Sequence, residues 1–425
     1  MSEIKKLKGF YDRYPEEWRS WRWMMDKVEQ TAREFGFNEL NAPSVERADL
    51  YRVKSGEELM DQMYNFEDKG GREVSLIPEQ TPTRARLIQQ RKDLKSPIKW
   101  FDTSKRWRYE NVQRGRDREF FQTDFDIFGV DSVEADAEII AAAAECFKKM
   151  DLQDRVEFKI SNRKIIQGFL EAKDVAEVEE VMKVIDDEEK MSDEEFDNEL
   201  EELELSENEI SDVKDVVSIR GDFREELGRL KEIAPEEIED RIERMEALAD
   251  ALDAYGVLEI CKLDLSIVRG LAYYTGLVFE AFDTEGELRA LFGGGRYDDL
   301  VGLFGGREVP AVGFAFGYSP TKELLKKEDR WPVKTPETDV YILTVSDSVR
   351  EKGLEYATEL RDYGLKVETD LKSRGFGSQL DYADSLDAKR VLIVGERDLE
   401  KGKVTMKHMD SGEEEELDQD EVLEH

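Results

Sequence analysis

Two strands joined by an arginine-rich loop are the feature that most constrains how this chain can fold. In the segment IKWFDTSKRWRYENVQRGRDREFFQTDFDIFG, residues 98–129, the second strand alternates apolar and polar residues, which predicts a sheet with one polar face. The polar positions of both strands and the loop are Arg106, Arg108, Glu110, Arg114, Arg116, Arg118, Gln122, Asp124 and Asp126. The alternative is an exposed hairpin whose arginines pair with nearby carboxylates. Five arginines beside a row of polar groups favour phosphate binding, because each guanidinium presents a planar fork of donors.

The composition sets the size and the charge of the protein. The chain has 425 residues, a length typical of two or three domains, and 39% of them are hydrophobic, which argues for packed domains rather than disorder. It holds 101 acidic and 63 basic residues, and its formal net charge is -38. The acidic residues spread along the whole chain. At about 1 M salt the Debye length is about 3 Å, so this pattern favours a salt-adapted organism over an ordinary acidic protein.

Few residues could support metal or disulfide chemistry. Cys146 and Cys261 lie far apart and predict neither a disulfide framework nor a zinc site, so a reducing cytoplasm is the expected location. With only His408 and His425, histidine-based metal or triad chemistry is nearly excluded, and the terminal LEH is consistent with a cloning-tag remnant. We find no signal peptide and no apolar run long enough to span a membrane, and we therefore expect no membrane contact.

The chain divides into four segments. Strands and helices alternate over residues 1–155 and return as strands over 259–330, and we expect these two parts to form one sheet domain. Residues 156–258 predict a mainly helical, acidic insertion whose charge is interpreted as a solvated face. After a proline-punctuated linker, residues 337–425 alternate strand and helix and end in a hairpin, which predicts a separate α/β domain.

The segment LIPEQTPTRARLI, residues 76–88, is a second candidate for chemistry. Glu79, Thr81 and Thr83 lie just before an arginine-rich stretch that is predicted to be a helix. One interpretation is a strand-to-helix turn in which Thr81 or Thr83 caps the helix. The other is that Glu79 anchors an ammonium group in a cleft, and the sequence of this segment alone leaves both open.

Two further segments combine strand character with glycine. The stretch FGGGRYDDLVGLFGGREVPAVGFAFG, residues 292–317, lacks the spacing of a dinucleotide fingerprint. Its glycines are expected to let a backbone or a flat ligand lie close to the sheet. The stretch IVRGLAYYTGLVFEAF, residues 267–282, predicts a strand that bends at Gly270, so that Arg269 and Tyr274 can face one cavity.

These segments together resemble a known family. WRYENVQRGRDREFFQTDFDIFG resembles motif 2 of class II aminoacyl-tRNA synthetases in its histidyl version, and VRGLAYYTGLVFE resembles the signature of histidyl-tRNA synthetases. The glycine-rich segment is similar to the run into motif 3, and LKGFYDRYPEE to the family's N-terminus. The resemblance covers nearly the whole chain. It implies an α+β class II catalytic domain with an antiparallel sheet flanked by helices, a helical insertion and a C-terminal α/β anticodon-binding domain.

The resemblance also implies a reaction and a set of roles. Histidine is activated with ATP and Mg²⁺ to histidyl-adenylate and then transferred to tRNA(His). Arg108 and Arg269 would hold the α-phosphate, Glu110 the adenine and Arg116 the outer phosphates of ATP. The residues expected to bind L-histidine are Glu79, Thr81, Gln122, Asp126, Tyr274 and Tyr297. Local basic residues expected to contact tRNA are Arg114, Arg118 and Arg374, and no side-chain metal ligands are expected beyond the Mg²⁺ carried by ATP.

Two positions depart from the family pattern. Ala272 stands where the signature has aspartate, and Pro320 stands where motif 3 usually has an arginine that contacts ATP. An active ligase is therefore weighed against a catalytically weak, synthetase-like regulatory protein that binds histidine or tRNA. The anticodon-domain segment and the retained Arg108, Arg269 and Glu79 favour the enzyme. The family implies a homodimer, because class II sheets use motif 1 as an interface.

Overall fold

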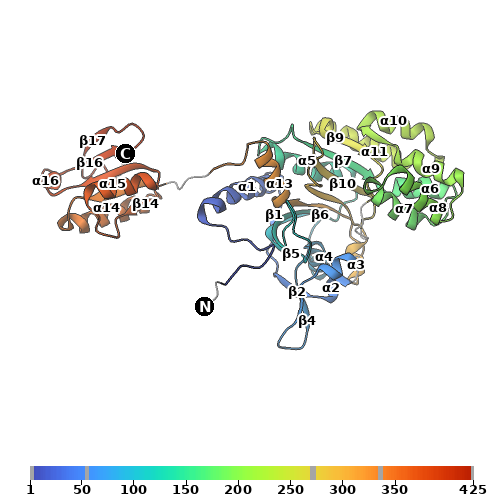
Figure 1. The fold of residues 1–425 in the computed structure, drawn as a ribbon, viewed down its shortest axis with the longest axis horizontal. Coiled ribbons are helices and arrows are strands. Elements are labelled where there is room, and N and C mark those ends of the chain that lie inside the picture. Colours follow the sequence, from blue (N-terminus) through green and yellow to red (C-terminus); the bar gives the residue numbers. More distant parts are fainter. Residues whose placement is uncertain (1–3, 53–56, 269–273, 334–337, 423–425) are drawn as a thin grey trace. The chain divides into compact units, whose positions relative to one another are not determined.

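The computed structural model describes residues 4–52, 57–268, 274–333 and 338–422. The chain divides into two compact units (Figure 1). The first contains Met1–Asp12 and Trp21–Trp331, and the second contains Arg13–Ser20 and Pro332–His425. Arg269, Gly270 and Ala272, which the sequence singles out, lie outside the described residues, as does His425.

A sheet of nine described strands forms the centre of the first unit, in the order β1-β5-β6-β12-β11-β10-β7-β9-β8. Neighbouring strands run antiparallel except for the pairs β1–β5 and β7–β9. The strands are β1 (Asn38–Glu39), β5 (Ile98–Trp107), β6 (Glu119–Phe128), β7 (Val156–Asn162), β8 (Arg220–Asp222), β9 (Cys261–Asp264), β10 (Leu277–Asp283), β11 (Phe292–Arg296) and β12 (Ala311–Gly317). The predicted sheet is confirmed, and the two parallel pairs lie toward its edges.

Helices with one apolar stripe cover this sheet. In the helix α1, Trp21, Met25, Val28 and Ala32 recur at helical spacing and are all buried. In α5 the alanine-rich segment is buried almost throughout, since small side chains let a helix lie close to a sheet. The helices outside the insertion are α1 (Pro15–Glu34), α2 (Asp49–Arg52), α3 (Glu57–Gln62), α4 (Thr81–Gln90), α5 (Val133–Lys148), α12 (Leu300–Leu303) and α13 (Tyr318–Lys327).

A small second sheet lies beside α2 and α4, in the order β2-β4-β3. Its strands are β2 (Val45–Arg47), β3 (Asn65–Glu67) and β4 (Glu73–Leu76), and they pair antiparallel. The chain leaves β4 and enters α4 within five residues, 77–81, and this short turn carries Glu79. The second sheet thus fixes one wall of the candidate site.

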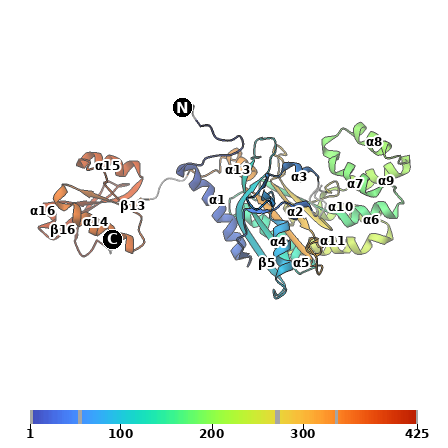
Figure 2. The same ribbon diagram turned by 90° about the horizontal axis from the view of Figure 1, so that it is seen from below.

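The acidic insertion is mainly helical, as predicted. In Figures 1 and 2 its first helices gather in one lobe beside the β9 end of the sheet. Ser192 and Ser206 begin α8 and α9 with complete capping boxes to Glu195 and Glu209, which explains where these acidic helices start. The helices are α6 (Arg163–Ala172), α7 (Val178–Asp187), α8 (Asp193–Glu202), α9 (Glu207–Val217), α10 (Phe223–Ile233) and α11 (Glu239–Ala254).

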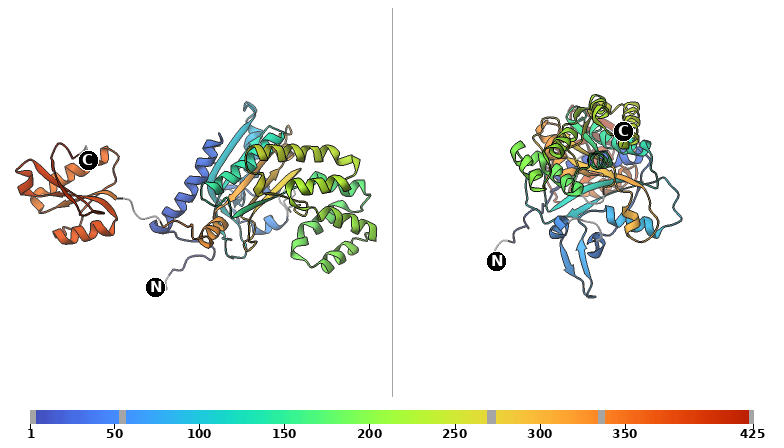
Figure 3. Two further views of the ribbon diagram at one scale, coloured as in Figure 1. Left: turned by 90° about the horizontal axis from the view of Figure 1, so that it is seen from above. Right: turned by 90° about the vertical axis from the view of Figure 1, so that its right-hand side faces the viewer.

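The C-terminal unit is a five-stranded sheet within the described residues, in the order β14-β13-β15-β16-β17. Alternate residues of β13 face opposite sides, so Val340 and Ile342 pack against α14 while Tyr341 and Leu343 pack against α15. Figure 3 shows helices on both sides of these strands. The predicted α/β pattern is confirmed. The elements are β13 (Thr338–Thr344), α14 (Arg350–Asp362), β14 (Val367–Thr369), α15 (Phe376–Ser385), β15 (Ala388–Val394), α16 (Glu396–Leu399), β16 (Lys403–His408) and β17 (Glu414–Asp418).

One strand prediction needs correction. The segment 267–282 was expected to be a strand from its start, but β10 begins only at Leu277. Ile267 and Val268 are buried without strand pairing, and Thr275 donates its backbone N–H to the carbonyl oxygen of Arg296 at 2.8 Å. Among the described residues, 267–268 and 274–276 thus lie outside β10, although the sequence predicts them as part of the strand.

Candidate active site

A cavity of about 1010 Å³ opens over the polar face of the central sheet. Its lining draws on β6, β10, β11 and β12, on the turn before α4 and on the segment after β5. The residues singled out from the sequence that line it are Glu79, Thr81, Arg108, Glu110, Arg116, Gln122, Asp126, Tyr274 and Tyr297. The structure therefore brings together residues that lie up to 218 positions apart, from Glu79 to Tyr297.

The floor of the cavity is the polar face that the alternation predicted. Gln122, Asp124 and Asp126 follow one another on β6 at every second position, and all three line the cavity. Gly313 of β12 pairs with Asp126 and also lines it. Because a glycine adds no side chain, the floor stays open beside the Asp126 carboxylate.

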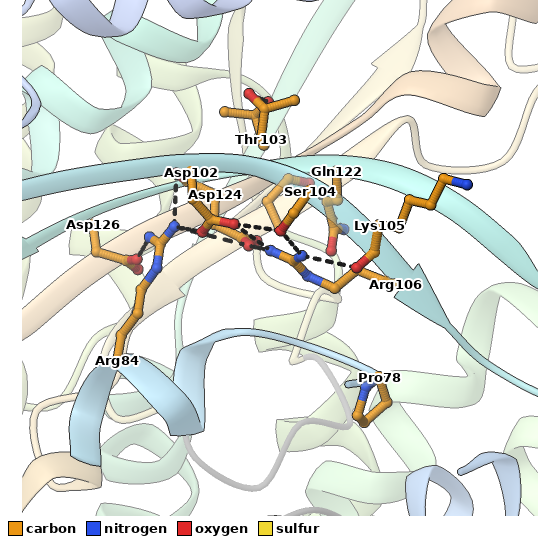
Figure 4. Close-up of polar contacts among 12 residues, drawn as sticks. Pro78, Arg84, Asp102, Thr103, Ser104, Lys105, Arg106, Gln122, Asp124 and Asp126 are labelled. Atoms are coloured by element: carbon orange, nitrogen blue, oxygen red, sulfur yellow. Dashed lines mark hydrogen bonds and ion pairs between the residues drawn. The ribbon is translucent and has the colours of Figure 1, made fainter. Parts of the chain in front are cut away.

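Two residues of this floor, Asp124 and Asp126, belong to a buried cluster of charged residues (Figure 4). Its members are Arg84, Asp102, Arg106, Asp124 and Asp126, which are 0–3% exposed. Arg84, from α4, donates to Asp126 Oδ2 and to Asp102 Oδ1, while Arg106 donates to Asp124 Oδ2 and, at 3.2 Å, to Asp102 Oδ2. Burial opposes the charge on Asp102, but Arg84 and Arg106 outweigh it and lower the pKa of Asp102 to about 2. The carboxylate is thus held ionised.

Tyrosines close the Asp126 side of the cavity. Tyr297 donates its hydroxyl to Asp126 Oδ1. The rings of Tyr274 and Tyr297 pack in one apolar cluster with Ile98 and Phe128, and their side chains are almost fully buried. A phenol with its ring fixed by packing holds its oxygen in one place, so this end of the cavity is a rigid polar pocket with apolar walls.

The arginines of the loop lie at the other end of the hairpin. Arg108 follows the last residue of β5, donates through Nε to the carbonyl oxygen of Pro78 at 2.9 Å and lies over the ring of Phe120. Arg116 pairs with Glu110, whose side chain is 8% exposed. Arg108 and Glu110 were expected on the strand itself, but both come after its end at Trp107. They still line the cavity, because the chain turns back toward β6 there.

The predicted tRNA contacts do not line this cavity. Arg114 is exposed and pairs with Glu323 at 2.8 Å, and Arg118 lies over the ring of Tyr109 at 3.7 Å from its centroid. Arg374 belongs to the C-terminal unit, where it pairs with Asp370 at 2.5 Å and lies 3.9 Å from the centroid of Tyr382. No structural feature of the described residues assigns these three arginines to a nucleic acid.

The expected threonine cap of α4 is wrong. Gln80 occupies the N-cap position, and its side chain makes no capping hydrogen bond. Thr81 is instead the first residue of the helix, and Pro82 stands in the first turn, where its missing N–H costs nothing. Thr81 is therefore available to the cavity that it lines.

Arg84 and its partner Asp102 in β5 were not recognised from the sequence as part of the site. Asp102 shares the polar parity of its strand with Arg106 and Arg108, which is the signal that could have found it. Arg84 carries no such signal, because a buried arginine in a helix looks the same in sequence as an exposed one. Only the packing of α4 on the sheet reveals it.

Comparison with known proteins agrees with this geometry. Residues 9–320 match the family model described as histidyl-tRNA synthetase, and residues 339–425 match that of an anticodon binding domain. The histidine–tRNA ligase of Natronomonas pharaonis is 46% identical over 412 residues, which cover 96% of this chain and 94% of that protein. The enzyme of Haloarcula marismortui is 42% identical over 411 residues with the same shares. Both are halophilic archaea, in agreement with the predicted salt adaptation.

A solved structure extends the likeness to the whole fold. The histidyl-tRNA synthetase from Nostoc sp. PCC 7120 is 26% identical, covers 100% of this chain and 99% of its own, and superposes with a TM-score of 0.84. Within the described ranges, each helix is too short or too polar to cross a membrane. From the match over residues 9–320 and the identity to its archaeal relatives, this chain belongs to the histidyl-tRNA synthetase family.

Proposed function

We propose that this protein is a histidine–tRNA ligase, which activates L-histidine with ATP and transfers it to tRNA(His). Relatives that are 41–46% identical over nearly the whole chain carry this activity in their names. The observation that carries the proposal is the cavity itself. The cavity contains hydrogen-bond acceptors suited to an amino acid, such as Glu79 and Asp126. It also contains the guanidinium groups of Arg108 and Arg116, which suit a nucleoside triphosphate.

The register of the hairpin supports one order of the two substrates along β6. Asp126 pairs with Trp100, Gln122 pairs with Ser104, and Arg108 follows the last pair of the strand. At about 3.4 Å per residue, an imidazole beside Asp126 would place the amino acid along β6, with its backbone toward Gln122. Its carboxylate would then point to the end of the strand where Arg108 lies. This order brings the nucleophile toward the α-phosphate.

The proposed chemistry needs cations and acceptors but no nucleophilic side chain. The histidine carboxylate attacks the α-phosphate, and pyrophosphate leaves. Arg108, with Arg269 outside the described residues, would stabilise the charge that develops on the transferring phosphoryl group. Mg²⁺ neutralises the outer phosphates when it is bound with ATP, and the described residues hold no cluster of three or more metal-ligating side chains.

ATP binding requires a rearrangement at the mouth of the cavity. Arg116 and Glu110 pair with each other, yet Arg116 is proposed for the outer phosphates and Glu110 for the adenine amino group. The Arg116 side chain is 39% exposed but that of Glu110 is 8% exposed, so opening the pair requires a new donor for the Glu110 carboxylate, which the adenine amino group would supply. In the complex with ATP, Arg116 would contact the outer phosphates and Glu110 would contact the adenine amino group, in place of the ion pair between them.

The larger assembly rests on the family. We propose a catalytic domain over 1–155 and 259–330, an insertion over 156–258 that adds β7 and β8 to the central sheet, and an anticodon-binding domain over 337–425. A cytoplasmic homodimer is expected from the same resemblance. Candidate tRNA contacts are Arg114, Arg118 and Arg374, whose guanidinium groups could exchange their present carboxylate or aromatic partners for phosphate. The regulatory alternative has no specific observation in its favour, and the match over 339–425 argues for the enzyme.

ATP–pyrophosphate exchange in molar KCl, with each of the twenty amino acids in turn, tests the function. Exchange with histidine alone is the expected result, followed by charging of tRNA(His). An Arg108→Ala variant should lose at least about 100-fold in exchange, since one charge-assisted contact in the transition state contributes about 3 kcal/mol. Arg91→Ala, which removes an exposed arginine paired with Asp93, is the control and should exchange normally. A wild-type protein that binds histidine without any exchange would favour the regulatory alternative.

A further inference from the structure

Arg84 has an unusual position for a charged residue. It stands on α4, its side chain is 0% exposed, and its guanidinium points toward Asp126 and Asp102 (Figure 4). Burying an unpaired guanidinium is very unfavourable, so its partners define what it does. These partners are the carboxylates of Asp126 and Asp102 and, at 3.3 Å, the carbonyl oxygen of Asp124.

The two arginines of the buried cluster share Asp102, and each has one further aspartate as its main partner. Among the described residues, Arg84 is the arginine that contacts Asp126, whereas Arg106 contacts Asp124 and Asp102. The remaining hydrogen bonds of Arg106 go to Ser104 Oγ and the carbonyl oxygen of Lys105. Among the described cations, Arg84 is therefore the one that connects Asp126 to the cluster.

The cluster is not neutral. Two arginines face three aspartates, which leaves one net negative charge next to the cavity when all five groups are ionised. Arg84 and Tyr297 occupy two of the roughly four lone-pair positions of the Asp126 carboxylate. The remaining positions belong to a carboxylate that lines the cavity and is 2% exposed. Such a group is a fixed acceptor for an N–H donor.

We propose that Arg84 is a positioning residue for the amino acid, which holds the Asp126 carboxylate ionised and oriented toward the imidazole N–H of bound histidine. The inference deepens the proposed function and rests on it. Arg84 touches neither the amino acid nor ATP. It acts through Asp126, because a guanidinium on Oδ2 and a phenol on Oδ1 leave the carboxylate one orientation.

The alternative is a purely structural role, in which Arg84 only neutralises the charge of the buried aspartates. The two roles separate in a pair of charge-matched double variants. Arg84→Met with Asp102→Asn removes one positive and one negative charge and keeps the cluster at the same net charge. Arg106→Met with Asp102→Asn makes the same change on the other arginine, which leaves the contact between Arg84 and Asp126 in place.

The measurements are the histidine KM, the ATP KM and kcat in pyrophosphate exchange, the Kd of histidine by calorimetry, and the fold by circular dichroism. In the Arg84 double variant, the histidine KM and Kd should rise about tenfold or more, as expected for one lost charged hydrogen bond. The ATP KM should stay within about twofold. In the Arg106 double variant the histidine KM and Kd should rise less than in the Arg84 double variant, because the contact between Arg84 and Asp126 remains. Arg84→Lys with intact Asp102 should lie between wild type and the Arg84 double variant, because an ammonium cannot copy both bonds of the fork.

Each outcome decides the matter. A folded Arg84 double variant with a wild-type histidine KM and Kd would overturn the inference, and so would equal losses in the two double variants. If the wild type binds histidine but does not catalyse exchange, the proposed function fails while the Kd series still tests Arg84. A wild type that binds no histidine would overturn both.

Discussion

Gly313 is a residue of the site that leaves no room for a side chain. It faces Asp126 across the β12–β6 pair, and its φ does not require glycine. A Cβ added there would lie 2.8 Å from Tyr297 Oη and closer still to Asp126 Oδ1 and to the backbone oxygen of Phe125. The backbone oxygen cannot give way without moving the strand. Space, rather than conformation, therefore fixes this glycine.

Gly313→Ala should consequently weaken histidine binding. The added methyl group has to displace Asp126 or separate β12 from β6, and such overpacking costs about 1–3 kcal/mol. We expect a histidine KM about tenfold higher and a lower free energy of unfolding, measured by exchange kinetics and by urea titration in molar KCl.

Gly228→Ala is the matched control for this substitution. Gly228 lies on the exposed face of α10, and nothing surrounds the position of its missing Cβ within 4 Å. There alanine should leave the histidine KM unchanged and raise the free energy of unfolding by up to about 1 kcal/mol, through helix propensity. A Gly313→Ala enzyme that matched the Gly228→Ala enzyme in KM would show that the floor can relax.

Single residues also show how far the sequence alone reaches. Gln122 and Asp126 could be assigned to the cavity, because the period of a strand decides which face a side chain occupies. Arg84 could not, since a helix buries its polar residues only according to what packs against it. Ala272 and Arg269 lie outside the described residues, so their roles stay predictions.

At the scale of elements, alternation and turn residues predicted most of the strands, including the order of elements in the C-terminal unit. They failed at the ends of strands. β5 ends at Trp107, so Arg108 reaches the cavity from the segment after it rather than from the pleat. β10 starts at Leu277, ten residues after the predicted start. Where a strand ends depends on which neighbouring strands offer backbone hydrogen bonds, and the sequence of one segment does not identify those neighbours.

The junction of α5, α11 and β11 gives a prediction about pH. Asp136 of α5 contacts Arg296 of β11 at 2.6 Å and Arg244 of α11 at 3.2 Å. Burial raises the pKa of Asp136 to about 6, and the two guanidinium groups only partly offset this effect. In the unfolded chain the pKa is about 3.9, so the folded state binds the proton more tightly. The stabilisation that the folded state gains from the Asp136 proton is present at low pH and is lost as pH rises through about 6.

Asp136→Asn should remove this dependence. Between about pH 5 and about pH 8 the wild type should lose about 1 kcal/mol of unfolding free energy relative to the variant, measured by urea titration at each pH. Asp131→Asn serves as the control, because Asp131 contacts the same two arginines from a side chain that is 59% exposed. Parallel pH profiles of wild type and Asp136→Asn would contradict the raised pKa.

At the scale of the whole molecule, the dominant property is the net charge of -38. Some cations are held by more than one acid, as at Lys327, whose Nζ lies 2.8–3.1 Å from Asp283, Glu285 and Glu287. Many acids on the insertion helices remain exposed. A tRNA carries the same sign of charge, so the mean field of the protein opposes its approach, and only local basic groups favour it.

Salt should therefore assist this enzyme at two levels. Raising KCl from about 0.15 M to about 1 M shortens the Debye length from about 8 Å to about 3 Å, which weakens both the self-repulsion of the fold and the repulsion of tRNA. We expect the urea midpoint and the rate of pyrophosphate exchange to rise together, because exchange needs the fold but no tRNA. Charging of tRNA should rise at least as steeply. Sucrose, which favours compact states without screening charge, is the control and should stabilise the fold without lowering the tRNA KM. Charging that is fastest in dilute buffer and collapses in molar KCl, while exchange persists, would mean that attraction to basic patches outweighs the mean repulsion.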